Sequence, residues 1–178
     1  MTPLTHHAGQ SSVGALFRGR AQLHPDAPAI QTSDGRILSY GALNARVNRA
    51  AALLARLGVA RGDRVAILSE NRPEYLELLL ACAKLGAILA CQNWRLAPPE
   101  VKHCNKLVEP RAVFVSERHQ ALLEKAALTL GAPTVVLGDD YESRLAAESD
   151  AEPAIAAQAE DDLMILYTSG TTGLPKGA

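Results

Sequence analysis

The sequence carries almost no net charge, and it has no long hydrophobic run. Its 18 basic and 19 acidic residues give a formal net charge of −1, which offers no electrostatic basis for binding nucleic acid or an anionic membrane. Every apolar stretch is far shorter than the roughly 20 residues that a membrane-spanning helix needs. The first residues, MTPLTHHAGQSS, lack the basic and apolar segments of a signal peptide. We therefore expect a cytoplasmic protein that has no membrane span and binds no nucleic acid.

Cysteine is also scarce, and the arrangement of the three cysteines argues against a disulfide framework. Cys82, Cys91 and Cys104 form no C-x-x-C pair and are odd in number, as expected of reduced thiols in a cytosol. Cys82 falls in an apolar helical stretch, where core packing is its expected role. A metal site made of Cys91, His103 and Cys104 fits no structural zinc spacing and lacks a fourth ligand, so we expect none.

The hydrophobic pattern defines the first elements of the fold. The chain has 178 residues, enough for one large domain or two small ones. Residues 40–58 carry apolar side chains every three or four positions, which predicts an amphipathic helix with Gly58 as its stop. Residues 64–91 contain two short apolar runs around an apolar helical segment that opens near Pro73. This strand–helix–strand pattern is typical of a parallel βαβ unit.

Helical and extended segments continue to alternate along the rest of the chain. Residues 1–11 are expected to form a mobile tail, with residues 12–178 folded. A helix is predicted before Pro25, and a hairpin is predicted around Asp34-Gly35. The pattern further predicts helices at 97–109 and 118–131, strands at 111–117, 133–140 and 161–170, and a weak helix followed by a linker within 141–160. Such alternation predicts an α/β fold with a mainly parallel sheet and flanking helices.

The last predicted strand runs directly into a loop, YTSGTTGLPKGA, whose composition suits one type of ligand. Open α/β sheets bind ligands at the carboxyl ends of their strands. Glycines let the backbone approach a ligand closely, hydroxyls donate hydrogen bonds, and successive backbone N–H groups form an anion nest. The residues concerned are Gly170, Gly173, Gly177, Thr168, Ser169, Thr171, Thr172 and the cation Lys176. Together they predict a phosphate-binding loop.

Two alternatives to this interpretation come from the residue types alone. A Walker A loop requires Gly before its lysine and Ser or Thr after it, whereas Pro175 and Gly177 flank Lys176 here. The hydroxyl that holds Mg²⁺ in that motif is therefore absent from its proper place. The other alternative is an ordinary turn, because Gly, Ser and Thr are common in turns.

The order of the residues in this loop distinguishes between the alternatives. T-S-G-T-T-G-x-P-K-G resembles the signature loop of the adenylate-forming superfamily, which contains acyl-CoA synthetases, peptide-synthetase adenylation domains and firefly-type luciferases. LSYGALNARVNRAAALLARLGVARGDRVAIL and LLLACAKLGAILACQNWRL resemble further segments of that superfamily, and the resemblance runs from Phe17 to Ala178. Ala42 stands where Glu is common and Ala178 where Val is usual. Neither departure touches the phosphate chemistry.

The resemblance implies an acid–thiol ligase, most like an acyl-CoA synthetase of fatty acid metabolism. In such enzymes a carboxylate attacks the α-phosphorus of ATP, which yields an acyl-adenylate and pyrophosphate. A thiol such as that of CoA then takes the acyl group. Because charge develops on the phosphate oxygens, catalysis needs hydrogen-bond donors and Mg²⁺ around them. The implied substrates and cofactors are therefore ATP, Mg²⁺, CoA and a small-molecule carboxylic acid.

The resemblance also assigns roles within the loop. Thr168 is the implied Mg²⁺ ligand or lies beside it, and Lys176 neutralises phosphate charge. Tyr167 is expected to pack the end of the strand. The residues implied to hold the β- and γ-phosphates of ATP are Thr168, Ser169, Gly170, Thr171, Thr172 and Gly173.

Outside the loop, the roles that we expect for individual residues are structural. Asn93, Trp94 and Arg95 resemble the N-W-R-L run of many acyl-CoA synthetases, and a packed connector is the favoured role of Trp94. Arg72 and Glu74 are expected to cap and charge a helix.

Members of this superfamily are several times longer than 178 residues, so we expect an incomplete N-terminal part of the large domain. The segments for adenine, ribose and the acyl group would lie outside it, as would the catalytic lysine of the small C-terminal domain. No catalytic residue is expected within this chain, which alone should catalyse neither half-reaction. Two alternatives remain: an adenylation domain that loads a carrier protein, and a non-catalytic α/β module that self-associates through exposed apolar surface.

Overall fold

A six-stranded sheet, in the order β6-β5-β3-β4-β7-β8, forms the centre of the structure. The structure is a computed structural model that describes residues 11–126, 131–169 and 174–178. Every neighbouring pair in this sheet is parallel except β7 and β8, which form an antiparallel hairpin. The strands are β3 (Arg64–Leu68), β4 (Ile88–Gln92), β5 (Ala112–Ser116), β6 (Thr134–Leu137), β7 (Met164–Ser169) and β8 (Pro175–Gly177). The predicted α/β fold with a mainly parallel sheet is confirmed.

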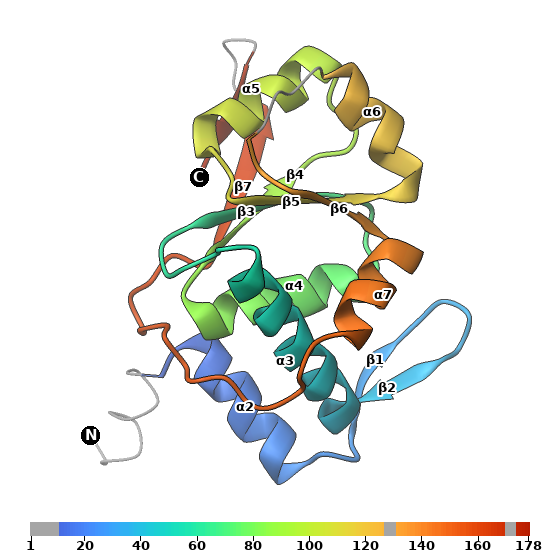
Figure 1. Ribbon diagram of the computed structural model, residues 1–178, viewed down its shortest axis with the longest axis vertical. Coiled ribbons are helices and arrows are strands. Elements are labelled where there is room, and N and C mark those ends of the chain that lie inside the picture. Colours follow the sequence, from blue (N-terminus) through green and yellow to red (C-terminus); the bar gives the residue numbers. More distant parts are fainter. Residues whose placement is uncertain (1–10, 127–130, 170–173) are drawn as a thin grey trace.

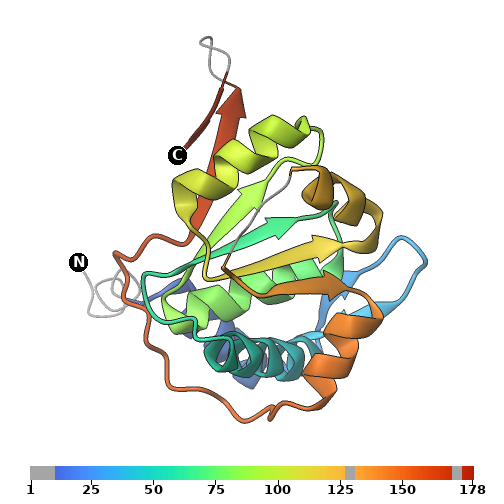
Figure 2. The same ribbon diagram turned by 45° about the horizontal axis from the view of Figure 1, so that its top comes forward.

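Helices cover both faces of this sheet (Figure 1). One face carries α3 (Tyr40–Arg56), α4 (Pro73–Leu85) and α7 (Asp139–Ala146), and the other carries α5 (Pro98–Val108) and α6 (Gln120–Lys125), as Figure 2 also shows. Helix α2 (Val13–Leu23) packs against α3 and α4. A two-stranded sheet of β1 (Pro28–Gln31) and β2 (Ile37–Ser39) joins α2 to α3, at the place where the hairpin was predicted. The predicted tail lies, apart from Ser11, outside the described residues.

The two helical layers explain why the central strands are apolar along their whole length. Val65, Ile67 and Leu68 of β3 are fully buried, because one helical layer covers each face of a parallel sheet. Helix α4 lies between the sheet and α2, which accounts for apolar residues almost all round its axis. It begins at Pro73 and ends at Gly86, whose φ of 70° is left-handed. The start of the helix stands where the sequence predicts it.

Two predicted elements differ in extent from the observed ones. Part of the helix predicted over 118–131, residues 127–130, lies outside the described residues. The described part is a short 3₁₀ turn, Glu117–His119, followed by α6, which ends at Lys125. The strand predicted over 133–140 ends at Leu137, because Gly138 has a φ of 129° that breaks the extended conformation. Helix α7 therefore begins two residues earlier than the predicted helix, with Asp139 and Asp140 in its first turn, where the helix dipole favours acidic side chains.

A buried carboxylate holds three helices together beneath the sheet. Glu77 of α4 is 1% exposed and accepts hydrogen bonds from Arg46 of α3, at 3.2 Å from Nη2, and from the Tyr141 hydroxyl of α7, at 3.0 Å. Arg46 also donates to Glu142 at 3.0 Å. Burial raises the pKa of Glu77, and the guanidinium of Arg46 opposes that rise. The pairing with Arg46 therefore compensates for the loss of water around this carboxylate.

Helices α2 and α4 pack with their backbones in contact, and this close approach leads to a first prediction. A Cβ atom on Gly14 would lie 2.5 Å from the carbonyl oxygen of Ala83 and 2.9 Å from the Cα of Lys84. Because the backbone of α4 cannot turn aside, Gly14→Ala should lower the free energy of unfolding by about 1–3 kcal/mol. The measurement is the urea midpoint of the 178-residue chain.

The matched control for this prediction lies on the same helix. Gly19 has no atom within 4 Å of the position that a Cβ would take, so Gly19→Ala should raise stability by up to about 1 kcal/mol through helix propensity alone. Equal effects of the two substitutions would show that α2 and α4 do not approach as described.

Candidate functional site

The hairpin formed by β7 and β8 carries the described part of the predicted phosphate loop. Thr168 and Ser169 end β7, and Lys176 lies in β8 directly opposite Thr168. Opposite residues of an antiparallel pair project from the same face, and both Thr168 and Lys176 are exposed. The hairpin therefore places a hydroxyl and a cation side by side. Residues 170–173, with Gly170, Thr171, Thr172 and Gly173 of the predicted site, lie outside the described residues.

Helix α5 holds this hairpin in place through Tyr167. The Tyr167 hydroxyl donates to the carbonyl oxygen of Cys104 at 3.2 Å, and β8 contacts the same helix. Burial raises the pKa of Tyr167, so its hydroxyl remains a donor at neutral pH. At the base of the hairpin, Leu166 and Ala178 exchange two backbone hydrogen bonds of 2.8 Å. Tyr167 thus packs the strand end, as the sequence predicted.

The carboxyl ends of the neighbouring strands β3 and β5 meet in a polar cluster that sequence reasoning missed. Glu70, after β3, accepts a hydrogen bond of 2.8 Å from Ser116 at the end of β5. Its carboxylate lies 3.3 Å from Nε2 of His119. No sequence signal marks this cluster, because Glu70 is more than forty residues from Ser116 and His119 and meets them only where β3 pairs with β5.

Trp94 covers the side of this cluster and behaves as a packed connector. Its ring stacks on His119 with centroids 5.3 Å apart, and the guanidinium of Arg95 lies 4.3 Å from its centroid. Trp94 also packs against a small core cluster that includes Leu68 and Val101. This packing supports the role that the sequence favoured for Trp94.

Arg72 and Glu74 also take the positions expected of them. Arg72 is the N-cap residue of α4, and Glu74 stands in the first turn of that helix. The Arg72 side chain donates to Glu74 at 2.9 Å through Nε. The two residues therefore place charge at the start of the helix and bond to each other.

The cysteines do not assemble a metal site. All three are buried free thiols, and burial raises the pKa of each, to about 11 for Cys104. Within residues 11–126, 131–169 and 174–178, no group of three or more His, Cys, Asp or Glu side chains could hold a metal ion. Over the same residues, no helix has both the length and the apolar character needed to cross a membrane.

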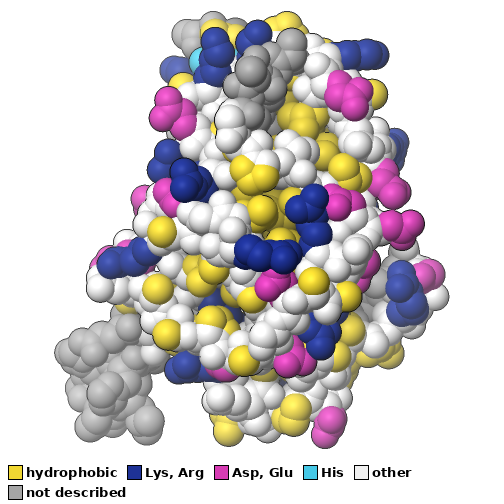
Figure 3. Space-filling model, viewed as in Figure 1, with side chains coloured by type: hydrophobic (Ala, Val, Ile, Leu, Met, Phe, Trp, Pro, Cys, Tyr) yellow, Lys and Arg dark blue, Asp and Glu magenta, His cyan; other side chains and the backbone are white. Residues whose placement is uncertain are grey.

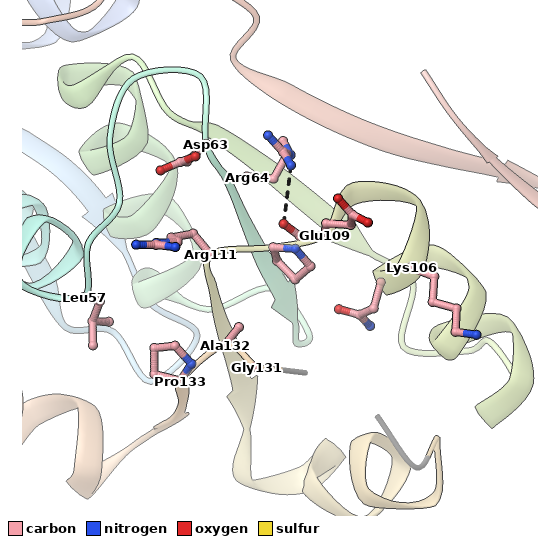
Figure 4. Close-up of a pocket in the computed structure, with 11 residues that line it drawn as sticks. Leu57, Asp63, Arg64, Lys106, Glu109, Arg111, Gly131, Ala132 and Pro133 are labelled. Atoms are coloured by element: carbon pink, nitrogen blue, oxygen red, sulfur yellow. Dashed lines mark hydrogen bonds between the residues drawn. The ribbon is translucent and has the colours of Figure 1, made fainter. Parts of the chain in front are cut away.

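A hollow of about 990 Å³ lies at the opposite, amino-terminal edge of the sheet (Figure 4). The two arginines that line it are used within the fold. Arg64 donates through Nε to the carbonyl oxygen of Val108 at 2.6 Å, and Arg111 donates to that of Gly58 at 3.1 Å. These carbonyls end α5 and follow α3, where a helix leaves its acceptors unpaired. The hollow is therefore lined by helix-capping arginines, and we do not assign the site to it.

The comparison with known families decides what the hairpin belongs to. The profile of the family described as AMP-binding enzyme matches residues 17–178, which include the whole hairpin. This chain belongs to the AMP-binding enzyme family.

Relatives of this chain include ligases named for an acid and for a carrier protein or CoA. It is 36% identical to the fatty acid–[acyl-carrier-protein] ligase ScoC of Streptomyces coeruleorubidus, over 97% of this chain and 33% of that protein. It is 40% identical to the indoleacetate–CoA ligase of Aromatoleum aromaticum, over 89% of this chain and 32% of that protein. The chain thus spans about a third of the length of the curated relatives it matches.

Solved structures agree with the family assignment. The N-terminal domain of FACL13 from Mycobacterium tuberculosis matches with a TM-score of 0.86 and 35% identity, over 93% of this chain and 43% of that one. The Mycobacterium tuberculosis fatty acyl CoA synthetase matches with a TM-score of 0.84 and 32% identity, over 93% of this chain and 34% of that one. The AMP-binding chain therefore has the fold of the N-terminal part of such enzymes.

The contact between Tyr167 and α5 leads to a second prediction. Tyr167→Phe removes the hydrogen bond between the Tyr167 hydroxyl and the Cys104 carbonyl, which should lower the free energy of unfolding by about 1 kcal/mol. The measurement is again the urea midpoint. Tyr40→Phe is the control, because no described residue hydrogen-bonds the Tyr40 hydroxyl, and it should change stability by less than about 0.5 kcal/mol. A larger loss from Tyr40→Phe would contradict the role given to Tyr167.

Proposed function

We propose that this chain is the N-terminal part of the large domain of an ATP-dependent acid–thiol ligase that forms acyl-CoA from a fatty or related carboxylic acid. The observation that carries the proposal is the β7–β8 hairpin, which sets Thr168 opposite Lys176 at the carboxyl edge of a parallel sheet. The family match and the ligases among the relatives support it. The cytoplasm, which supplies ATP and CoA, is the proposed location.

Within this proposal, the loop binds the phosphates of ATP. The segment from Thr168 to Gly173 holds the β- and γ-phosphates through backbone N–H groups and hydroxyls. Lys176 lowers the charge repulsion between those phosphates and the attacking carboxylate, and it binds the pyrophosphate that leaves. The step forms a bond between the carboxylate oxygen and the α-phosphorus. It breaks the bond between the α-phosphorus and the oxygen that bridges to the β-phosphate, which leaves as part of pyrophosphate. These residues bind and orient ATP, and none of them transfers a proton.

Thr168 is the proposed contact for Mg²⁺. Its hydroxyl is a hard oxygen ligand on an exposed side chain at the end of β7. Mg²⁺ prefers oxygen ligands, keeps several waters, and commonly binds through one or two protein groups together with substrate phosphates. The residue therefore fits the ion, which would neutralise phosphate charge when bound.

The acceptor thiol is the point on which the relatives diverge. The indoleacetate–CoA ligase and the ScoC carrier-protein ligase resemble this chain to a similar degree. CoA is the proposed acceptor, and an acyl carrier protein is the second candidate that ScoC supports. Thioester formation with each acceptor, assayed with the same acid, separates the two.

Another candidate function is a non-catalytic module that self-associates. Leu166 and Leu174, both in the hairpin segment, are 53% and 50% exposed, and exposed apolar side chains on an edge hairpin favour association. Sedimentation of the 178-residue chain over a range of concentrations tests this candidate, which predicts a mass that rises with concentration.

A third prediction concerns Lys176 in the polypeptide that the gene encodes through its natural stop. Lys176→Met should raise the KM for ATP by about tenfold in carboxylate-dependent exchange of labelled pyrophosphate into ATP, because one ionic contact to phosphate is worth about 1–2 kcal/mol. Lys106→Met is the matched control. Lys106 is also exposed, but it lies on α5 and lines the hollow at the opposite edge, so the KM of this variant for ATP should be unchanged. An unchanged KM in Lys176→Met would remove Lys176 from the site.

A fourth prediction concerns the 178 residues alone. They supply phosphate contacts only, and the curated relatives are about three times as long, so the purified chain should show neither pyrophosphate exchange nor acyl-CoA formation. A panel of fatty and aromatic acids, assayed beside the longer polypeptide, provides the measurement. Activity of the short chain would overturn this prediction, and silence of both chains would overturn the proposed ligase.

A further inference from the structure

Residues 147–163, here named the strap, join α7 to β7 without forming a helix or strand. In Figures 1 and 2 the strap runs along the outside of the layer that holds α3 and α4 before it enters the sheet as β7. Its sequence, AESDAEPAIAAQAEDDL, is rich in alanine and contains few large apolar side chains. Ile155, the larger of the apolar residues at its centre, is only half-buried. Apolar packing alone therefore favours no particular path of the strap strongly.

The strap is attached instead to a buried cation on α4. Lys84 is 0% exposed. Its Nζ lies 2.7 Å from Oδ1 of Asn44, 2.6 Å from Oδ1 of Asn48 and 2.6 Å from Oε1 of Glu152. An ammonium group has three N–H donors, and each has one acceptor here. Two acceptors come from α3 and the third comes from the strap, so the cation joins α3, α4 and the strap.

The acceptors are themselves hydrogen-bonded into a closed network. The second oxygen of Glu152 accepts from Nδ2 of Asn44 at 3.0 Å and from Nδ2 of Asn48 at 3.2 Å. Asn48 also donates to the backbone carbonyl of Asp150 at 2.9 Å. The backbone adds a further bond, from the Ala156 N–H to the carbonyl of Lys84 at 3.0 Å. The network therefore requires Glu152 beside Lys84, and a strap shifted along the chain would place another residue there.

The second end of the strap is also fixed. Asp161 accepts two hydrogen bonds from Arg61, of 2.8 Å and 2.6 Å. Two residues later, the Leu163 carbonyl accepts from Leu89 at 2.9 Å, and Met164 then pairs with Leu89 in the β4–β7 ladder. The strap therefore connects the Lys84 network directly to the register in which β7 joins the sheet.

The geometry points to Lys84 as a positioning residue that sets the register of the strap and, through it, of β7. Buried ion pairs add little stability compared with apolar packing, and a role in specifying one arrangement is their best-attested use. A shift of one residue in β7 would reverse the direction of every side chain in the strand, which would turn Tyr167 from α5 and Thr168 from Lys176. The effect on the phosphate loop rests on the proposed function; the effect on the strap does not.

The test is amide hydrogen exchange on the 178-residue chain carrying Lys84→Met, which keeps an unbranched side chain, one atom shorter, and removes the charge. Exchange protection of the strap and β7 should fall by about tenfold or more, whereas protection in β3 and β5 should fall by less than about twofold, because local opening is separable from global unfolding. A uniform fall in all strands, or no fall in the strap, would overturn the proposal.

A matched control uses another contact between α3 and the same strap. Arg49 and Asp150 form an ion pair of 3.0 Å whose side chains are 38% and 53% exposed. Exposed pairs contribute little, so Arg49→Gln should change strap protection by less than about twofold. A loss as large as that of Lys84→Met would show that any strap contact suffices, and would overturn the role given to Lys84.

A double substitution separates the network from side-chain packing. Glu152→Gln should also loosen the strap, and Lys84→Met combined with Glu152→Gln should loosen it no further than the larger single effect, because the two residues act through one contact. Additive losses would overturn the proposal. Glu152→Gln alone keeps the test valid where Lys84→Met does not fold, since the Glu152 side chain is 28% exposed.

The consequence for ATP is measured in the longer polypeptide. Lys84→Met should raise the KM for ATP in pyrophosphate exchange by about threefold to tenfold, although Lys84 hydrogen-bonds no described residue of the loop. If the unsubstituted polypeptide is inactive, the proposed function fails while the exchange result on the strap stands. If the polypeptide is active and Lys84→Met leaves both strap protection and KM unchanged, the positioning role is overturned and the proposed function stands.

Discussion

The pairing of β7 with β4 is the interaction on which the candidate site depends. Its register sets Leu89 opposite Met164 and Cys91 opposite Leu166. Because side chains alternate along a strand, the same register directs Tyr167 to α5 and leaves Thr168 on the other face, opposite Lys176. Parallel strands cannot be joined by a short turn, so β7 reaches β4 only after the chain has passed through two further strands and three helices. The position of the candidate phosphate loop therefore depends on the whole layered structure.

The parts of the fold that could be predicted from sequence are those whose determinants are local. The buried run of β3, Pro73 at the start of α4 and Gly86 at its end each act within a few residues, and they specify the βαβ unit almost completely. The strap could not be predicted in the same way. Its alanine-rich sequence has no period, and its path depends on Lys84 and Arg61, which are far from it along the chain.

The candidate site also has a part that local sequence predicts and a part that depends on distant segments. The order of residues in T-S-G-T-T-G-x-P-K-G is a local signal, and it places the loop at the end of a strand, where β7 ends. The contact between Glu70 and His119 and the capping of helix ends by Arg64 and Arg111 arise where distant segments meet, and no short motif indicates them. Charges of both signs are interspersed over the face in Figure 3, so surface charge would not have located the site either.

Two polar contacts of different kinds act on β7. One holds the strap that precedes the strand, and the other holds Tyr167 near the end of the strand. Lys84 stands in the last turn of α4, where the negative end of the helix dipole favours a cation. Burial lowers the pKa of Lys84, and Arg18 acts in the same direction, whereas Glu152 opposes them. Burial alone would raise the pKa of Glu152, yet hydrogen bonds from Lys84, Asn44 and Asn48 lower it. Glu152 thus opposes the effect of burial on Lys84, and this hydrogen-bonded pair holds the strap that leads into β7. The neutral bond from Tyr167 to α5 holds the other end of the strand. A strand held at both ends keeps one register, and that register sets where β7 ends and the glycine-rich segment begins.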